Sequence, residues 1–318
     1  MSQSEHSYPI RSLCRLLGIS AQGYYKHNYV SDEKDILASS IVLYCMYVRS
    51  DEHLPRSGCR ELYQLCRQYF KEKFTIGRDR FYSILRSNGL MLRKKRYRPR
   101  TTDSRHGYLL YDDLVNTSPR YIPQMCGSLV VCDITYIYTT DGFAYLSLAT
   151  DAYSRYIVGH CLCSTLEVDG PLNAMNQAIR TYHRYGIDIE NMIHHSDRGV
   201  QYASKVYTDM LKSNNIRISM TQTGDPLHNA LAERMNNTLK NGWFFNDGNM
   251  SFEQAEIAIS RSIDMYNTAR PHKALGMGTP LEILTGESKN PLMKYRQGNG
   301  LLAGTDTSST CQSKLSER

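Results

Sequence analysis

The chain has 318 residues, 41% of them apolar and 22% charged, with a formal net charge of +7. This composition excludes a disordered or fibrous chain and allows about two domains of ordinary size. The longest apolar runs, such as residues 41–48, are far shorter than the ~18–20 residues that cross a bilayer, and the polar N-terminus lacks a signal-peptide layout. We therefore expect a cytoplasmic protein that does not enter a membrane.

The charge is distributed unevenly along the chain. Residues 1–100 contain 19 Lys and Arg against 9 Asp and Glu, whereas residues 101–318 contain 19 against 22. Lysine and arginine side chains that neutralise phosphates release counterions, which supplies most sequence-independent affinity for nucleic acid. The basic N-terminal part predicts a polyanionic partner, with nucleic acid as the first candidate.

Residues 1–30 predict a helix-turn-helix-like segment. We expect a short helix from residue 9 with Leu13, Leu16 and Leu17 inward, a turn at Gly18, and a second helix to residue 26 that Ser20 caps. A separate packing helix is expected at residues 34–49, because its apolar residues recur at helical spacing.

Residues 31–100 predict a helical DNA-binding region that ends in a basic linker. A helix pair is expected at 58–90, and its second helix carries Arg78, Arg80 and Arg86, which we interpret as DNA contacts. The alternative is a small helical bundle with ordinary solvated arginines. The run at 93–100 then places six basic side chains where they can follow a phosphate backbone: Arg93, Lys94, Lys95, Arg96, Arg98 and Arg100. A solvated linker is the alternative for this run.

Residues 101–125 are polar and predict a linker between two domains. From residue 126 to 285 the pattern becomes α/β: three antiparallel strands are expected at 129–138, 143–150 and 155–163. Helices and short strands then alternate, with helices at about 171–185, 203–214, 227–242 and 252–268 and strands near 192–193 and 216–219. This order predicts a mixed sheet with flanking helices. A polar flexible tail is expected at 286–318.

Three carboxylates occupy positions that suit chemistry. Asp133 lies within an apolar strand, where a charge is costly unless it is paired or bound to a metal. Asp197 follows a short buried strand, and Glu233 shares one helix face with Asn229, Asn236, Asn237 and Lys240. Converging carboxylates can bind hard divalent cations, and two such ions can promote displacement at a phosphodiester. Each residue also has a structural alternative: an arginine pair for Asp133, a turn for Asp197 and an exposed helix face for Glu233.

At these residues the sequence resembles the DDE transposases and retroviral-type integrases, most closely the OrfB-type transposases of bacterial insertion elements. The similar segments are residues 133–155, 194–204, 228–244 and 266–280, and the two N-terminal helical regions also match. Thirty-five residues separate Asp197 from Glu233, which is the D-D-35-E spacing, and Lys240 matches the basic residue seven positions after the glutamate.

The resemblance implies a ribonuclease H-like core in which Asp133, Asp197 and Glu233 are catalytic and bind Mg²⁺ or Mn²⁺, with two ions expected. It also implies that Lys240 and Asn237 lie near DNA. The activity implied is metal-dependent strand cleavage and strand transfer at insertion-element ends. The implied partners are the terminal inverted repeats, target DNA, further copies of the chain on DNA, and a protein encoded by an upstream reading frame.

Other polar residues of this region are interpreted as structural. The pair His194 and His195 has no C-x-x-C partner for a zinc site, so we expect both residues to be structural at a strand end. Asp151, Asp141 and Asp225 are expected in turns. Two alternatives to an active transposase stay open at this point: a DNA-binding regulator with an idle catalytic core, and a nuclease without strand transfer.

Overall fold

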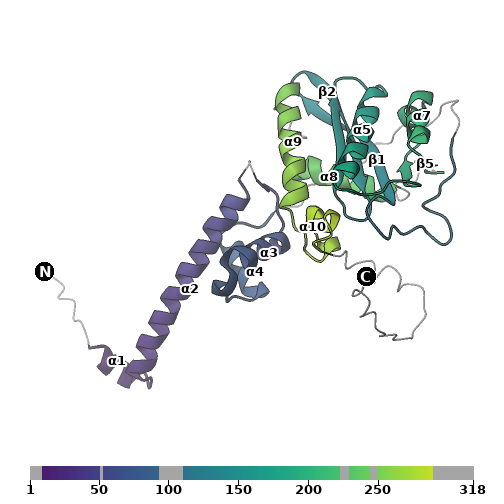
Figure 1. Cartoon of the computed structure of the whole chain (residues 1–318). Coiled ribbons are helices and arrows are strands. Elements are labelled where there is room, and N and C mark those ends of the chain that lie inside the picture. Colours follow the sequence, from purple (N-terminus) through teal and green to yellow (C-terminus); the bar gives the residue numbers. More distant parts are fainter. Residues whose placement is uncertain (1–8, 51–52, 93–109, 223–228, 244–248, 289–318) are drawn as a thin grey trace, which may run out of the picture.

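The computed structural model describes residues 9–50, 53–92, 110–222, 229–243 and 249–288, and the side chains of 26–34 are not part of this description. The basic run at 93–100, Asp225 and the tail from 289 lie outside the described residues. An elongated helical region precedes a sheet flanked by helices (Figure 1). In the described part of the chain, no helix has both the length and the apolar character needed to cross a membrane.

The N-terminal region differs from the expectation at two points. Helix α1 (Ile10–Leu16) is followed by one continuous helix, α2 (Ala21–Val48), where two separate helices were expected. Ser20 caps α2 as predicted, by accepting a hydrogen bond from the Gly23 amide over 2.9 Å. Between residues 26 and 34 the sequence contains neither glycine nor proline, so nothing ends the helix there.

The second difference concerns the leucines of α1, which were expected to point inward. Leu13, Leu16 and Leu17 are 41%, 84% and 69% exposed, and Cys14 is the buried residue of this helix. In the described chain α1 packs mainly on α2, and a seven-residue helix with one neighbour buries only one narrow side. The prediction of inward leucines was therefore wrong.

The rest of the helical region follows the sequence pattern. Helix α3 (Cys59–Phe70) leads through the 3₁₀ turn η1 (Lys71–Lys73) to α4 (Arg78–Ser87), which is the helix pair expected at 58–90. Ile41 of α2, Leu62 of α3 and Phe81 of α4 are fully buried in one apolar cluster. The cluster continues into the sheet domain, so the two parts of the chain are packed together.

The second domain contains a five-stranded mixed sheet in the order β3-β2-β1-β4-β5. Its strands are β1 (Leu129–Thr139), β2 (Gly142–Asp151), β3 (Ile157–Cys163), β4 (Ile193–Ser196) and β5 (Arg217–Met220). The first three strands pair antiparallel, and β4 and β5 add in parallel to β1. This is a ribonuclease H-like arrangement, and the predicted fold class is confirmed.

Helices cover both faces of the sheet. On one face α5 (Asp169–Arg184) packs on β2 and β3, and Gly159 permits the close approach because a Cβ there would collide with the Ala174 carbonyl oxygen. The helices α6 (Val200–Ala203) and α7 (Lys205–Ser213) contribute to the core on the same face. The other face is covered by α8 (Ala230–Gly242) and α9 (Phe252–Thr268), and η3 (Lys273–Leu275) and α10 (Pro280–Leu284) follow.

Part of the stretch expected as a linker, residues 101–125, is instead packed on the sheet domain. Val115 and Asp113 are 6% and 8% exposed, and the Leu114 amide donates a hydrogen bond to the Ser219 hydroxyl of β5 over 2.9 Å. Val115 shares an apolar cluster with Leu129 and Ile193. The polar composition of this stretch did not indicate these contacts. The buried carboxylate of Asp113 is tolerated there because it accepts hydrogen bonds from Val115 and Asn116.

Candidate active site

Asp133 lies near the middle of β1, the central strand of the sheet, and its side chain is half-buried. One carboxylate oxygen accepts a hydrogen bond from the Ile134 amide over 3.0 Å. The other accepts one from the side-chain amide of Asn236 over 2.7 Å. The sequence placed this carboxylate inside an apolar strand, and the structure gives it two donors.

Asp197 directly follows β4, the parallel neighbour of β1. The register pairs Val131 with His195, so Asp133 and Asp197, two residues further along, reach the same level of the sheet. The Asp197 carboxylate accepts a hydrogen bond from the Gly199 amide over 2.9 Å, which fixes the turn that leads into α6. This is the strand edge at which α/β sheets place their sites.

Glu233 lies in the first turn of α8, and two asparagines of this helix reach β1. Asn229, at the N-cap position, does not cap the helix but donates to the Cys132 carbonyl oxygen over 3.1 Å. Asn236 donates to Asp133, the next residue of the strand. Glu233 therefore lies between two residues of its helix, Asn229 and Asn236, that are both hydrogen-bonded to the strand of Asp133.

The pKa of Asp133 reports the closeness of the three carboxylates. Burial is the largest cause that raises this pKa, from 3.8 to about 8, and the negative charges of Asp197 and Glu233 raise it further. The hydrogen bonds from Ile134 and Asn236 lower it but do not outweigh burial and like charge. The structure thus brings all three predicted residues within electrostatic range of one another.

Lys240, also on α8, is a cation within electrostatic range of Asp133. Burial lowers the pKa of Lys240, and the charge of Asp133 opposes that shift, so the ammonium group lies in the field of the carboxylate. Lys240 and Asn237 are both half-buried, and each retains a surface that a ligand can contact.

The donor set fits a hard divalent cation by its chemistry, because it consists of carboxylate oxygens. In addition, the side-chain oxygens of Asn229 and Asn236 are buried and have no hydrogen-bond partner among the described residues, so they can accept from water around a cation. Among the described residues, however, no group of three His, Cys, Asp or Glu side chains is close enough together to hold a metal as it stands. A cation would have to draw the like-charged carboxylates toward one another.

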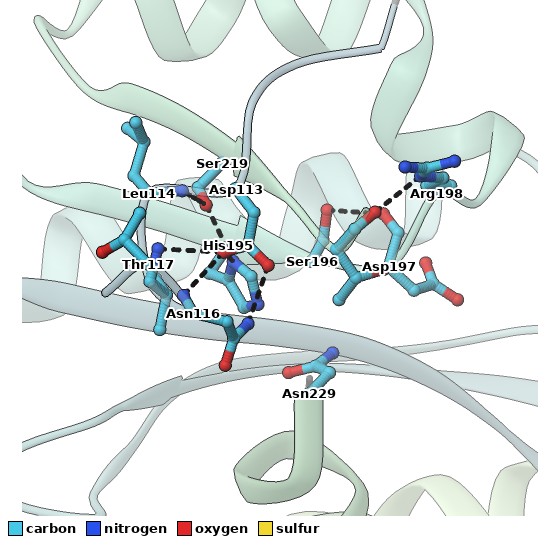
Figure 2. Close-up of polar contacts among 12 residues, drawn as sticks. Asp113, Leu114, Asn116, Thr117, His195, Ser196, Asp197, Arg198, Ser219 and Asn229 are labelled. Carbon is cyan, nitrogen blue, oxygen red and sulfur yellow. Dashed lines mark hydrogen bonds and ion pairs between the residues drawn. The ribbon is translucent and has the colours of Figure 1, made fainter. Parts of the chain in front are cut away.

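The two histidines expected to be structural are buried in β4. His194 contacts the Tyr207 hydroxyl over 3.0 Å, and burial lowers its pKa to about 3, so its imidazole is neutral. His195 contacts the Ser219 hydroxyl over 2.9 Å and lies 4.0 Å from Asp113. Figure 2 shows His195 with Ser219 and Asp113, beside Ser196 and Asp197. Both histidines fix β4 just before Asp197, as expected.

Asp113 completes this cluster. Burial alone would raise the pKa of Asp113, but hydrogen bonds from Asn116 and Val115 and the neighbouring His195 lower it. Asp113 was expected in a linker, and its role was missed because nothing in the local sequence indicates a partner on β4.

Asp151, expected in a turn, ends β2 and is fully buried. Its carboxylate accepts hydrogen bonds from Gly127, Ser154 and Tyr182, among others, and so fastens the end of the strand. Asp141 accepts from the Phe252 amide over 2.8 Å and ties the β1–β2 hairpin to α9. Both carboxylates have structural partners, as the turn interpretation predicted.

The candidate DNA contacts of the N-terminal region lie elsewhere on the molecule. Arg78, Arg80 and Arg86 are all exposed on α4, and Arg78 forms an ion pair of 3.4 Å with Asp79. The six basic residues at 93–100 lie outside the described residues.

Comparison with known proteins finds matches of the kind that the sequence motifs resemble. Residues 123–226 and 214–280 each match a model of the integrase core domain. The chain is similar to a putative transposase for insertion sequence element IS986/IS6110 of Mycobacterium tuberculosis, with 36% identity over 167 residues. This match covers 52% of the chain and 60% of that relative.

Longer matches at lower identity were also found. The chain is 29% identical to the transposase for insertion sequence element IS629 of Shigella sonnei, over 89% of this chain and 93% of that one. It is 26% identical to transposase InsF for insertion sequence IS3A of Escherichia coli K12, over 91% and 98%. Among solved structures, the HTLV-2 integrase catalytic core domain in complex with magnesium aligns with a TM-score of 0.39 at 15% identity, over 50% of this chain and 97% of that one. The predicted resemblance to insertion-element transposases with an integrase core is confirmed.

Proposed function

From the premise that residues 123–280 form an integrase core domain, we propose that this protein is a transposase that cleaves and joins DNA strands at insertion-element ends. The observation that carries the proposal is the cluster of Asp133, Asp197 and Glu233, in which burial and, to a smaller extent, the two neighbouring negative charges raise the pKa of Asp133. Such a cluster destabilises the protein unless a cation or a proton offsets its negative charge. In an integrase core, divalent metal ions that promote phosphodiester chemistry are the cations that suit it.

Asp133, Asp197 and Glu233 would hold Mg²⁺ or Mn²⁺, and we propose two ions. When bound, such ions activate a water or a 3′-hydroxyl and stabilise the leaving oxygen of a phosphodiester. The buried amide oxygens of Asn229 and Asn236 would accept hydrogen bonds from water in the site. No covalent bond between protein and DNA is required.

The remaining residues of α8 would position the DNA. The ammonium group of Lys240 is attracted by the carboxylate of Asp133. When the scissile strand enters, a DNA phosphate would take over part of this attraction to Lys240. Asn237 is adjacent on the half-buried surface and would add a neutral hydrogen bond to the backbone. These contacts orient the strand but carry no sequence information.

DNA recognition would depend on the N-terminal region. The exposed arginines of α4, Arg78, Arg80 and Arg86, and the basic run at 93–100 would contact the terminal inverted repeats. We further propose that target DNA is bound near α8, and that several copies of the chain assemble on DNA. A protein from an upstream frame would supply further end recognition. The protein would act in the cytoplasm, on DNA.

The test is a strand-cleavage and joining assay with the purified full-length chain, Mg²⁺ or Mn²⁺, and DNA from the repeats that flank the gene. Nicks at the repeat ends together with joined products, both lost in Asp197→Asn, would support the transposase. Nicks without joined products would instead support a nuclease. DNA binding without any cleavage, also when the upstream-frame protein is added, would contradict the proposal and favour a regulator with an idle core.

A further inference from the structure

The helix that carries Glu233 also carries the contact between the two parts of the chain. Trp243 follows α8 directly, and its indole N–H donates to the His53 carbonyl oxygen of the helical region over 2.9 Å. The indole is only 6% exposed. One end of α8 thus faces β1 with Asn229 and Glu233, and the other end is fastened to the segment that leads into α3.

A second contact crosses the same boundary. Arg270, just after α9, forms an ion pair of 3.3 Å with Glu61 of α3, and its guanidinium lies 5.7 Å from the centre of the Trp243 ring. The side chains of Arg270 and Glu61 are only 17% and 20% exposed, so solvent weakens this pair less than an exposed one. Arg270 therefore links α3, α9 and the end of α8.

Apolar packing continues across the boundary. Met235, Leu239 and Trp243 form one stripe of α8, at intervals of four residues, on a different side of the helix from Asn236 and Lys240. The stripe is buried in a cluster that includes Leu54 and Leu62 of the helical region. Closely packed interiors are hardly compressible, so they transmit small displacements. The position of α8 on the sheet therefore depends on how the helical region packs against it.

We propose that Trp243, Arg270 and Glu61 are positioning residues, which set the place of Glu233 relative to Asp133 through the docking of the helical region on α8. DNA-binding helices and carboxylates would then be coupled within one chain. The consequence for strand cleavage rests on the proposed function, whereas the mechanical coupling does not.

Glu61→Gln is the sharpest variant. Glu61 also accepts a hydrogen bond from the amide of Gly58, the N-cap residue of α3, over 2.9 Å, and glutamine retains that acceptor while it removes the charge that pairs with Arg270. Glu72→Gln, at an exposed position of η1, is the matched control. Arg270→Gln removes the charge of the other partner. Arg270→Lys keeps a positive charge, so it should retain part of the ion pair with Glu61.

The experiment is hydrogen exchange on the full-length chain, with circular dichroism and thermal melting to show that each variant is folded. We expect the amides of residues 230–242 to exchange at least threefold faster in Glu61→Gln and in Arg270→Gln than in the wild type, with an intermediate value in Arg270→Lys and no change in Glu72→Gln. Unchanged exchange of α8 in both charge-removing variants would overturn the proposal. Trp243→Phe removes the indole donor but keeps an aromatic ring, and unchanged exchange there would also count against it.

Cleavage provides a separate readout. If the transposase assignment is right, Glu61→Gln should lower the single-turnover cleavage rate at least threefold at saturating DNA and leave the DNA dissociation constant within twofold. Faster exchange in α8 without any cleavage by the wild type, also when the upstream-frame protein is added, would keep the coupling and refute the proposed function. A normal cleavage rate in Glu61→Gln would overturn the proposed positioning role.

Discussion

Asn236 donates a side-chain hydrogen bond of 2.7 Å to Asp133, although the two residues are 103 positions apart in the sequence. The bond joins the helix of Glu233 to the strand of Asp133 and orients one carboxylate oxygen. Outer residues that orient ligand carboxylates typically matter 10–100-fold for metal affinity or activity. We therefore expect Asn236 to orient Asp133 in the proposed site.

Asn236→Ala is expected to lower the cleavage rate roughly 10–100-fold, with partial recovery when the Mg²⁺ concentration is raised. The measurement is the single-turnover rate over a Mg²⁺ titration. Asn237→Ala, on the neighbouring half-buried surface, is the comparison, and its effect should appear in DNA affinity and not in the Mg²⁺ dependence. A rate within twofold of the wild type for Asn236→Ala would contradict the role of this bond.

The raised pKa of Asp133 predicts a pH dependence of stability. Its pKa in the folded chain is about 8, against an ordinary value of 3.8, so the folded state retains a proton that the unfolded state has released. The resulting stabilisation is complete below about pH 4 and is lost as the pH rises toward 8. Thermal melting with a chelator should therefore show a steeper fall between pH 5 and 8 in the wild type than in Asp133→Asn. Equal slopes in the two proteins would refute the raised pKa.

Lys240 is expected to act as a phosphate contact. Lys240→Gln should reduce the slope of log binding constant against log salt concentration by about 1, whereas Lys240→Arg should preserve the slope. Fluorescence anisotropy at several salt concentrations measures this. An unchanged slope in Lys240→Gln would contradict a phosphate contact and leave Lys240 only its interaction with Asp133.

The basic run at 93–100 should contribute sequence-independent affinity. Replacing its six lysines and arginines with glutamine is expected to weaken binding to all DNA sequences alike, with a salt slope lower by up to about 5. Binding to terminal-repeat DNA and to a scrambled duplex should be compared. A loss confined to the repeat DNA, or an unchanged slope, would contradict the assignment as a phosphate-tracking tether.

The sequence pattern predicted the sheet domain well, because its signals are local. Runs of β-branched and aromatic residues and the turn at Asp141–Gly142 predicted the first three strands, and one helix face carried Glu233 together with Asn236 and Lys240. Asp197 was placed at a strand end, and its spacing to Glu233 carried the resemblance to the D-D-35-E family.

Long-range features were missed because no local pattern encodes them. Trp243 and Glu61 lie in segments far apart in sequence, and their shared neighbour Arg270 becomes visible only in the folded chain. The leucines of α1 looked like core residues because a helical stripe predicts a buried face, but one neighbouring helix leaves most of that face exposed. Asp113 was taken for a linker residue because its distant partner, His195 of β4, is not visible in the local sequence.

The central claim is that Asp133, Asp197 and Glu233 act together in metal-dependent strand cleavage. Its most direct test measures cleavage of repeat-end DNA and DNA affinity side by side for Asp133→Asn, Asp197→Asn and Glu233→Gln. We predict that each substitution abolishes cleavage with Mg²⁺ and with Mn²⁺ while the dissociation constant for DNA stays within a few fold. Cleavage at a rate near that of the wild type by any of the three variants would contradict the account.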